Sequence, residues 1–363
     1  MKIVFVLPEG QGGPVGGYRV VYEYANRLSR RGHVVTVLHV WGLERRPSLV
    51  RLVAGSIVHR RPPIRRYRPA WFDLDAHVAS LALTRWSSMP IRGADVVVAT
   101  SWRTAQELGS RPNGLYLIQH YEDWAGPRDA VDATWRLDLQ KVVIADWLVE
   151  KSRELGAGQP VLVPNAIDDS VFGQDIPPAL RTSNHVAMLW HSASWKGSKD
   201  GLAALTRARE EVPTLTATFF STSSKPSDLP EWIKFHHNAT QSELRRIYND
   251  SPIFLSPSHT EGSPLPPSEA MACGAALIST DIPGVADRAI DNETALLVPV
   301  GDIDAMARAI VMLCNDREHR VVLADAGRER ILSKFSWDCS TDILENAMST
   351  RMAQALANGR LRF

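Results

Sequence analysis

Short runs of apolar residues alternate with amphipathic stretches along almost the whole chain. Six runs in the first half lack the strict alternation of a half-exposed strand, and they therefore predict buried strands of a parallel sheet: residues 2–7, 33–40, 95–100, 115–119, 141–145 and 160–165. Helical patterns fit between most of these runs, for example over residues 17–31 and 103–110. This succession of strand–helix units predicts one doubly wound, Rossmann-like α/β domain over residues 1–165.

A second series of the same kind follows residues 166–184, a polar and proline-bearing stretch that we interpret as a linker. Its apolar runs predict six further strands: residues 185–191, 215–221, 233–237, 253–257, 275–280 and 295–299. A helix over residues 240–249 should begin with a capping box, because Thr240 and Glu243 have the required spacing. We therefore expect a second α/β domain over residues 185–337 and a cleft between the two domains, where ligands usually bind.

Composition and charge fit an ordinary globular enzyme. A chain of 363 residues corresponds to about two domains, and its 44% hydrophobic and 22% charged residues exclude a largely disordered protein. The 41 basic and 40 acidic residues nearly cancel, which leaves no bulk charge suited to nucleic acid. The three cysteines lack metal-type spacing and indicate a reduced compartment. Because no signal-like start and no apolar run near the ~18 residues of a spanning helix is visible, we expect a cytoplasmic protein.

One segment concentrates positive charge. Residues 58–71 read "VHRRPPIRRYRPAW", in which arginines lie beside Tyr67 and Trp71. Two interpretations stay open: a solvated loop, or a patch that binds an anionic acceptor or an anionic lipid surface, where each basic residue contributes about 1 kcal/mol. The second interpretation predicts peripheral contact with the inner face of the membrane.

The turn between the first strand and the first helix is rich in glycine. Gly10, Gly12 and Gly16 follow the spacing of a variant dinucleotide-binding turn, in which backbone N–H groups approach a phosphate. An NAD site also needs an acidic residue at the end of the second strand, where it holds the ribose hydroxyls. That strand ends "VLHVWG", without Asp or Glu, so an NAD-dependent enzyme is disfavoured. A second interpretation stays open: a glycine turn whose backbone amides face a phosphate or a sugar.

Two glutamates stand eight positions apart in the second half. Glu261 lies in a loop rich in Gly, Pro and Ser that follows a predicted strand, and Glu269 lies in the first turn of the predicted helix "SEAMACG". Pro266 and Pro267 suit the start of that helix. The positive end of a helix binds a diphosphate well, and a carboxylate there can accept hydrogen bonds from ribose hydroxyls. Taken alone, Glu269 is equally consistent with a first-turn acid that the helix dipole favours.

The stretch "EGSPLPPSE" followed by "AMACG" resembles the E-x7-E signature of glycosyltransferase family 4, the retaining nucleotide-sugar enzymes with the GT-B fold. Further segments resemble this family in the same order along the chain: "GGYRVVYEYANRLSRRGHVV", "VLVPNAIDDSVF", "SWKGSKDGLAAL", "TALLVPVGDIDAMARAI" and "FSWD". The resemblance implies two Rossmann-like domains facing across a cleft, with a C-terminal helix at 338–363 that packs back on the first domain. The phrases "IQHYEDW" and "WKGSKDGL" are similar to a bacterial branch that acts on surface polysaccharides and includes rhamnosyltransferases.

The resemblance assigns roles to residues that match the family's motifs. Glu269 would bind the nucleotide ribose, and Glu261 would face the hydroxyls of the donor sugar. Lys196 would neutralise the diphosphate, where a fixed cation stabilises the charge that develops on the leaving group. The amides of Gly16 and Gly17 would complete the phosphate site from the other domain.

The acceptor side is expected near "LIQHYEDW". His120 in this phrase stands where the family often has a histidine in the catalytic cleft, and a capped loop histidine is the alternative interpretation. Its neighbours Tyr121, Glu122 and Trp124 are expected to contact the acceptor.

Two departures from the family's pattern concern the donor. An arginine often stands five residues before the lysine, and here that position is His191. Either the diphosphate is held with less fixed charge, or a neighbour such as Lys199 compensates. Pro264 has no N–H to donate, which leaves the donor-sugar contacts to Ser263 and to the amide of Leu265.

The implied reaction moves a sugar from a nucleoside-diphosphate sugar to an acceptor hydroxyl, in glycan or glycoconjugate biosynthesis. Configuration would be retained, and neither a metal nor another cofactor would be needed. The acceptor would be a glycan, a lipid-linked molecule or a small molecule. Asp73-Leu-Asp75 and Asp302-Ile-Asp304 have the D-x-D form of a metal motif, but Asp302 is better interpreted as a helix N-cap. Two alternatives stay open: a GT-B nucleotide-sugar epimerase or hydrolase, and a catalytically silent subunit that binds a sugar nucleotide.

Overall fold

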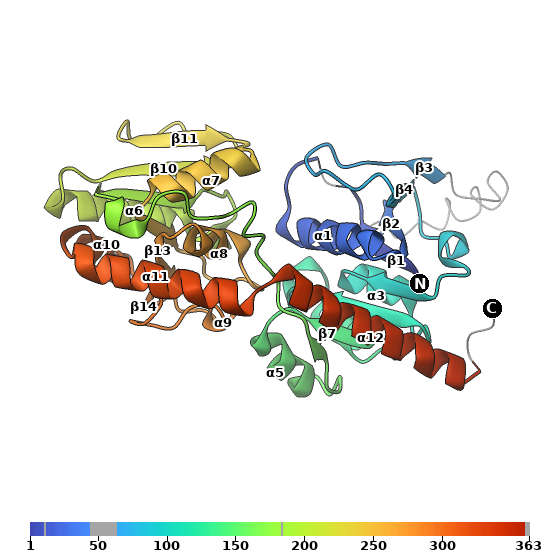
Figure 1. Ribbon diagram of the computed structural model, residues 1–363. Coiled ribbons are helices and arrows are strands. Elements are labelled where there is room, and N and C mark those ends of the chain that lie inside the picture. The colour runs from blue at the N-terminus through green and yellow to red at the C-terminus, as the bar shows by residue number, and fades with distance from the viewer. Residues whose placement is uncertain (11, 44–63, 183, 360–363) are drawn as a thin grey trace. The chain divides into compact units, whose positions relative to one another are not determined.

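The computed structural model describes residues 1–363 except residues 11, 44–63, 183 and 360–363. The chain divides into two compact units, the first made of Met1–Pro164 and Asp338–Phe363, the second of Asn165–Trp337. Each unit is a sheet of mostly parallel strands flanked by helices (Figure 1). No helix in the described ranges is both long enough and apolar enough to cross a membrane.

The sheet of the first unit has the strand order β3-β4-β2-β1-β5-β6-β7-β8. Its strands are β1 (Lys2–Pro8), β2 (Val34–Val40), β3 (Ile64–Arg66), β4 (Ala79–Leu83), β5 (Val96–Ala99), β6 (Gly114–Ile118), β7 (Gln140–Val143) and β8 (Val161–Leu162). Neighbouring strands are parallel except for β3 and β4, which are antiparallel. The helices of this unit are α1 (Gly16–Arg30), α3 (Trp102–Leu108), α4 (Arg128–Trp135), α5 (Asp146–Glu154) and α12 (Trp337–Ala357), with 3-10 turns η1 (Met89–Ile91) and η2 (Asp123–Ala125).

Two strands of this sheet, β3 and β4, were not predicted from the pattern of apolar residues. β3 reads Ile-Arg-Arg and is exposed throughout, so it lacks the apolar run that marks a buried strand. β4 reads "ASLAL", whose two alanines are weak strand formers. The last predicted strand, 160–165, contributes only Val161 and Leu162 to the sheet, because the chain leaves the sheet at Val163 and Pro164.

The helix α12 is fastened to the first unit by charge. Arg31, just after α1, donates to Asp342 at 2.6 Å and to Glu345 at 2.8 Å, and Nε2 of His33 lies 2.8 Å from Glu345. The hydroxyl of Ser340 donates to the carbonyl of Pro164 at 2.8 Å. The C-terminal segment therefore belongs to the same unit as the N-terminal strands.

The sheet of the second unit is wholly parallel, in the order β11-β10-β9-β12-β13-β14. Its strands match the six predicted runs: β9 (His185–Leu189), β10 (Thr216–Ser221), β11 (Ile233–His237), β12 (Ile253–Ser256), β13 (Ala276–Thr280) and β14 (Leu296–Val298). The helices are α6 (Ser198–Glu211), α7 (Gln241–Asp250), α8 (Leu265–Ala272), α9 (Pro283–Ala286), α10 (Ile303–Asn315) and α11 (Arg317–Lys334), with η3 (Pro178–Leu180) and η4 (Ser194–Lys196).

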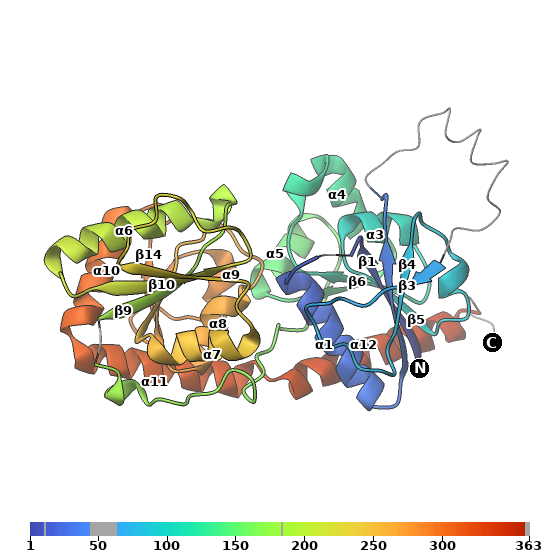
Figure 2. The same ribbon diagram turned by 90° about the horizontal axis from the view of Figure 1, so that it is seen from above.

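Successive residues of β9 point to opposite faces of this sheet and enter two separate cores. Val186 and Met188 pack with α6 and α10 on one face, whereas Ala187 packs with α7 and α8 on the other. Figure 2 shows α6 and α7 on opposite sides of the strands. Burial on both faces explains why these strands read as continuous apolar runs.

Local cues in the second unit behave as the sequence predicts. Thr240 and Glu243 form the reciprocal capping box of α7, and the Asp302 carboxylate accepts the N–H of Ala305 at 2.8 Å as the N-cap of α10. The stretch that we interpreted as a linker, residues 166–184, carries buried side chains such as Phe172 and Arg181, and its role as a linker stays a prediction. The buried Arg181 donates to the backbone carbonyls of Tyr248 and Ser251 at 3.1 and 3.2 Å.

Candidate functional site

The loops that follow β9 and β12 meet through an ion pair. Nζ of Lys196 lies 2.7 Å from Oε1 of Glu261, and the hydroxyl of Ser258 donates to the same oxygen at 2.8 Å. The two charged side chains are 23% and 14% exposed, so both are open to a ligand at one side. In open α/β sheets, ligands bind beyond the carboxyl ends of the strands, which is where these loops lie.

Backbone and side-chain contacts fix the positions of these two loops relative to each other. The N–H of His259 donates to the carbonyl of Trp195 at 2.7 Å, and the imidazole of His259 lies 2.6 Å from Asp200. Gly197 has φ +61°, and a Cβ at this position would lie 1.9 Å from the carbonyl oxygen of Pro257. Only glycine fits there, so the Lys-Gly pair has a structural reason that is separate from its charge.

His191 enters the same region as an uncharged group. Its Nδ1 accepts the N–H of Ala193 at 3.0 Å, which leaves the proton of the neutral ring on Nε2. Burial lowers the pKa of His191, and the positive charge of Lys196 lowers it further. The residue therefore offers a neutral hydrogen-bond donor where many members of the resembled family carry an arginine.

Glu269 is more deeply buried than Glu261. It is 3% exposed, and its Oε2 accepts the hydroxyl of Tyr248 from α7 at 3.0 Å. The prediction that Glu269 stands in the first turn of its helix is wrong, because α8 begins at Leu265 and Glu269 is its fifth residue. The helix begins earlier because proline at Pro266 and Pro267 is compatible with a first turn, whose N–H groups have no helical acceptor.

The start of α8 is also poorer in N–H donors than the sequence led us to expect. Pro264 is the N-cap, and Pro266 and Pro267 occupy two of the first three helical positions, so Leu265 alone among these four residues carries an amide proton. The hydroxyl of Ser263 accepts a hydrogen bond from Nε of Arg288 at 2.7 Å. Backbone amides therefore supply little of the positive potential at this end of the helix.

Three contributors to this region were not found by sequence reasoning: Ser258, Tyr248 and Arg288. Ser258 lies three residues before Glu261 and its hydroxyl was an available signal. Tyr248 sits in a predicted helix as one apolar-face residue among others, and Arg288 sits in "VADRAI", which reads as an exposed turn. Neither gives a signal of its contact before the fold is known.

The glycines of the first unit begin a helix. Gly16 and Gly17 are the first two residues of α1, after Val15 as N-cap, so their N–H groups have no acceptor within the helix. The carbonyl of Gly17 accepts the side-chain amide of Gln119 at 3.0 Å, and a Cβ at Gly17 would come within 3.2 Å of that amide. The position is compatible with a phosphate contact, and the predicted role of both glycines stays a prediction.

His120 is enclosed by aromatic rings. Its Nδ1 lies 3.1 Å from the carbonyl of Tyr121, and its ring packs edge-to-face on Trp124 and Trp147 at centroid distances of 4.5 and 5.4 Å. Because Nδ1 donates to a carbonyl, Nε2 is the nitrogen with a lone pair in the neutral ring. Trp124 is 57% exposed. The catalytic role of His120 and the acceptor role of Trp124 stay predictions.

The other two residues predicted on the acceptor side have partners in the fold. The hydroxyl of Tyr121 donates to Asp132 at 2.6 Å. Glu122 accepts the N–H of Trp102 at 2.7 Å at the start of α3, and burial raises the pKa of Glu122 to about 7. Both contacts lie within the fold, and the acceptor role of Tyr121 and Glu122 stays a prediction.

The basic segment 58–71 is described in part. Residues 58–63 lie outside the described residues. Arg65 and Arg66 are exposed on β3, whereas Arg68 donates to the backbone carbonyls of Leu74 and Asp75 at 2.5 and 3.1 Å. One arginine of this segment is therefore tied to the fold, and membrane contact stays a prediction.

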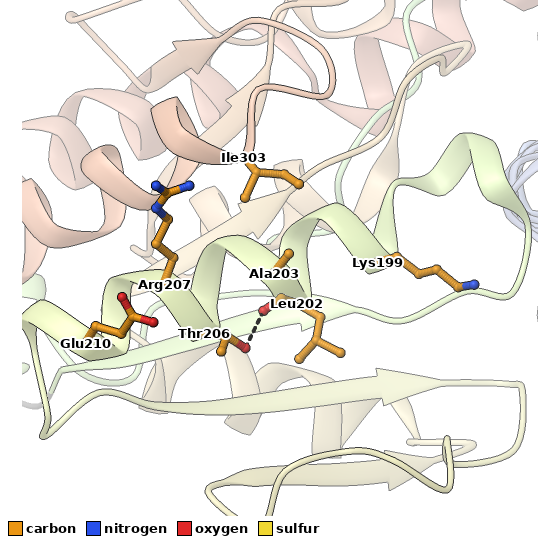
Figure 3. A pocket seen from close by; sticks show the side chains of 7 residues that line it. All are labelled: Lys199, Leu202, Ala203, Thr206, Arg207, Glu210 and Ile303. Atoms are coloured by element: carbon orange, nitrogen blue, oxygen red, sulfur yellow. Dashed lines mark hydrogen bonds between the residues drawn. The ribbon is translucent and has the colours of Figure 1, made fainter.

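A shallow groove of about 600 Å³ lies on the outer side of α6, beside the start of α10 (Figure 3). Lys199, which we considered as a compensating cation, is exposed and lines one end of this groove, and Arg207 farther along the helix pairs with Asp304. The remaining lining residues are Leu202, Ala203, Thr206, Glu210 and Ile303. The groove contains neither Lys196 nor the two glutamates, so it is separate from the site.

Metal-binding groups are not assembled in the described ranges, where no cluster of three or more His, Cys, Asp or Glu could hold an ion. Of the two D-x-D pairs, Asp302 caps α10 and Asp75 accepts the N–H of His77 at 3.0 Å. These carboxylates have local structural partners.

Part of the second unit matches a known protein family. Residues 219–330 match the model of the family Glycosyl transferases group 1. The matched stretch contains Glu261, Glu269 and Arg288, and excludes Lys196 and the first unit. Two curated relatives are similar over this part of the chain. The capsular polysaccharide biosynthesis glycosyltransferase CapM of Staphylococcus aureus is 32% identical over 109 residues, which is 30% of this chain and 29% of CapM.

The second relative is the D-inositol 3-phosphate glycosyltransferase of Saccharomonospora viridis, 32% identical over 111 residues, or 31% of this chain and 26% of that protein. The chain thus spans under a third of the length of these two relatives.

Solved structures match along almost the whole chain. Sucrose-phosphate synthase from Thermosynechococcus elongatus has a TM-score of 0.75 at 17% identity and covers 97% of this chain and 100% of its own.

HepE of Anabaena, in complex with UDP and glucose, has a TM-score of 0.72 at 13% identity and covers 96% of this chain and 100% of its own. At such identities the likeness shows the fold. The predicted fold class, two Rossmann-like α/β domains of the GT-B type, is confirmed. The cleft between the domains stays a prediction.

Proposed function

We propose that this protein is a glycosyltransferase that moves a sugar from a nucleoside-diphosphate sugar to an acceptor hydroxyl. The observation that carries the proposal is the Lys196–Glu261 ion pair at the carboxyl edge of the second sheet, together with Glu269 in α8. The glutamates lie in the stretch that matches the group 1 family, and the relatives over that stretch are named glycosyltransferases. HepE, of the same fold, binds UDP and glucose.

Each residue has a stated part in this proposal. Lys196 neutralises the diphosphate, which favours departure of the nucleotide. Glu261 orients the donor sugar through its hydroxyls, and Glu269 binds the ribose. We further propose that configuration is retained, with the leaving phosphate taking the acceptor proton. We propose that no metal or other cofactor is required, because Lys196 supplies a fixed cation at the phosphates.

The likeness to CapM, whose name refers to capsular polysaccharide, supports an acceptor of glycan or glycoconjugate type, and we propose that the protein acts in glycan biosynthesis. The test is a transfer assay in EDTA with a panel of UDP-, GDP-, dTDP- and ADP-sugars and glycan, lipid-linked and small-molecule acceptors. We expect one donor to give product, and we expect NMR of that product to show the same anomeric configuration as the donor. Donor turnover without an acceptor would favour an epimerase or a hydrolase. Binding of nucleotide without any turnover would favour a silent sugar-nucleotide-binding subunit.

A further inference from the structure

The loop that carries Glu261 rests on the segment that follows β13. A Cβ on Gly284, in α9, would lie 2.3 Å from the carbonyl oxygen of Glu261, so the two backbones are in direct contact. Four residues after Gly284, the side chain of Arg288 extends beneath the same loop, where its Nε donates to the hydroxyl of Ser263 at 2.7 Å. The loop that carries Glu261 therefore contacts this segment at two points, Gly284 and Arg288.

Arg288 is a buried cation that donates hydrogen bonds to neutral groups. Its side chain is 2% exposed; besides Ser263, it donates from Nη1 to the hydroxyl of Ser268 at 2.9 Å and from Nη2 to the carbonyl of Asn165 at 2.6 Å. Its guanidinium lies 4.4 Å from the centre of the Phe335 ring. Burial lowers the pKa of Arg288 to about 10, so it remains charged at neutral pH.

A buried charge of this kind is expensive to maintain. A guanidinium inside a protein is normally paired with a carboxylate, because neutral hydrogen-bond acceptors only partly replace its hydration. Arg288 donates to two hydroxyls and a backbone carbonyl and lies over an aromatic ring, and the negative charge of the neighbouring Asp287 raises its pKa and offsets part of the cost. An anion bound above the loop would supply further counter-charge through a medium that screens it weakly.

Among the described residues, the start of α8 and His191 add little positive charge to this neighbourhood. Three prolines leave the amide of Leu265 as the single N–H among the N-cap and first three positions of α8. His191 is held neutral by its hydrogen bond and by burial. A diphosphate carries two or more negative charges, and Lys196 is already shared with Glu261.

We propose that Arg288 is a positioning residue of the donor site, which holds Ser263 and the first turn of α8 in place and supplies fixed positive charge behind them for the diphosphate. This inference rests on the proposed function. Arg288 does not touch the ligand; it acts through Ser263, through Ser268 and through its field. It takes over the electrostatic part that a cation at position 191 would play.

The test separates charge from structure by comparing two ligands of different charge. Calorimetry would measure binding of a nucleoside diphosphate and of the matching monophosphate to the full chain, using the base that the wild type prefers. Arg288→Gln keeps hydrogen-bond donors and removes the charge, whereas Arg288→Lys keeps the charge. Arg320→Gln is the matched control, because Arg320 is also 3% exposed and donates to the carbonyls of Leu313 and Arg181 in the same unit.

We expect Arg288→Gln to reduce the ratio of diphosphate to monophosphate affinity at least tenfold, and Arg288→Lys and Arg320→Gln to keep that ratio within threefold of the wild type. Equal weakening of both ligands in Arg288→Gln, or no weakening, would overturn the inference. If Arg288→Gln does not fold, a tenfold loss of the ratio in Arg288→Lys would overturn it, and a preserved ratio would support it. Failure of the wild type to bind any nucleoside diphosphate would instead contradict the proposed function.

Discussion

The ammonium of Lys196 and the carboxylate of Glu261 form an ion pair of 2.7 Å between two loops that are 65 residues apart in the sequence. A diphosphate that approaches Lys196 therefore competes with Glu261 for the same ammonium, while Ser258 can keep its hydrogen bond to the carboxylate. Binding and catalysis should then respond in opposite ways to changes at Glu261.

We expect Glu261→Gln to bind a nucleoside diphosphate as tightly as the wild type or up to tenfold more tightly, because Lys196 is released, and to slow transfer at least a hundredfold. Lys196→Met should weaken the same ligand at least tenfold, since a cation at the phosphates is lost. Calorimetry and initial rates would measure both effects. Weaker diphosphate binding in Glu261→Gln would contradict this division of roles.

The ribose site depends on a second pair, Glu269 and Tyr248, whose hydroxyl donates to the carboxylate at 3.0 Å. If Tyr248 orients Glu269 for the ribose, Tyr248→Phe should weaken nucleotide binding about three- to tenfold, in line with about 1 kcal/mol for one hydrogen bond. It should leave a 2′,3′-dideoxy nucleotide unaffected. The binding constants of both nucleotides would decide, and an equal loss for the two would show that Tyr248 supports the fold alone.

Gly197 should be intolerant of any side chain. Gly197→Ala would place a Cβ against the carbonyl of Pro257 in a left-handed conformation, so we expect a loss of about 3 kcal/mol or more in unfolding free energy. Gly301→Ala is the control, because Gly301 has φ +75° but nothing within 4 Å of its Cβ position; about 1 kcal/mol is expected there. Urea titrations would compare the two variants. Equal losses would mean that φ alone, rather than the contact, sets the cost.

Acid should destabilise the first unit through His39. This buried imidazole is bridged to the hydroxyl of Tyr22 at 2.8 Å, and burial lowers its pKa from 6.5 to about 4. The unfolded chain binds a proton near pH 6.5 and the folded chain does not, so the stability is complete above pH 6.5 and is lost as the pH falls toward 4. His39→Gln lacks this proton uptake. The difference in unfolding free energy between the wild type and the variant should shrink from pH 7.5 to pH 5, and a constant difference would refute the assignment.

Much of the fold is predictable because its strands are buried on both faces. Continuous apolar runs such as residues 253–257 and 275–280 predict buried strands of a parallel sheet, and β12 and β13 form there. The exposed edge strand β3, with two arginines in three residues, carries no such pattern. The burial of Arg181 was not predictable either, because an arginine in a polar, proline-bearing stretch gives no sign of the backbone carbonyls that it contacts in the fold.

The candidate site was predictable in part. The spacing of Glu261 and Glu269 singled out the loop and helix, but their different burial followed from where α8 begins. The contact between Lys196 and Glu261 is set by the tertiary fold, and sequence spacing says nothing of it. Arg288 was not found for the same reason, since an arginine is ordinarily exposed and nothing in the sequence singles this one out.

The most direct measurement of the central claim is thermal unfolding of the wild type and of Glu269→Ala with UDP, GDP, dTDP, ADP and NAD. A ligand at 100 times its dissociation constant adds about 2.7 kcal/mol, which raises the melting temperature by several degrees for domains of this size. We predict that one nucleoside diphosphate stabilises the wild type and leaves Glu269→Ala unchanged. Stabilisation by NAD alone, or an equal shift in both proteins, would contradict a nucleotide-sugar site built on Glu269.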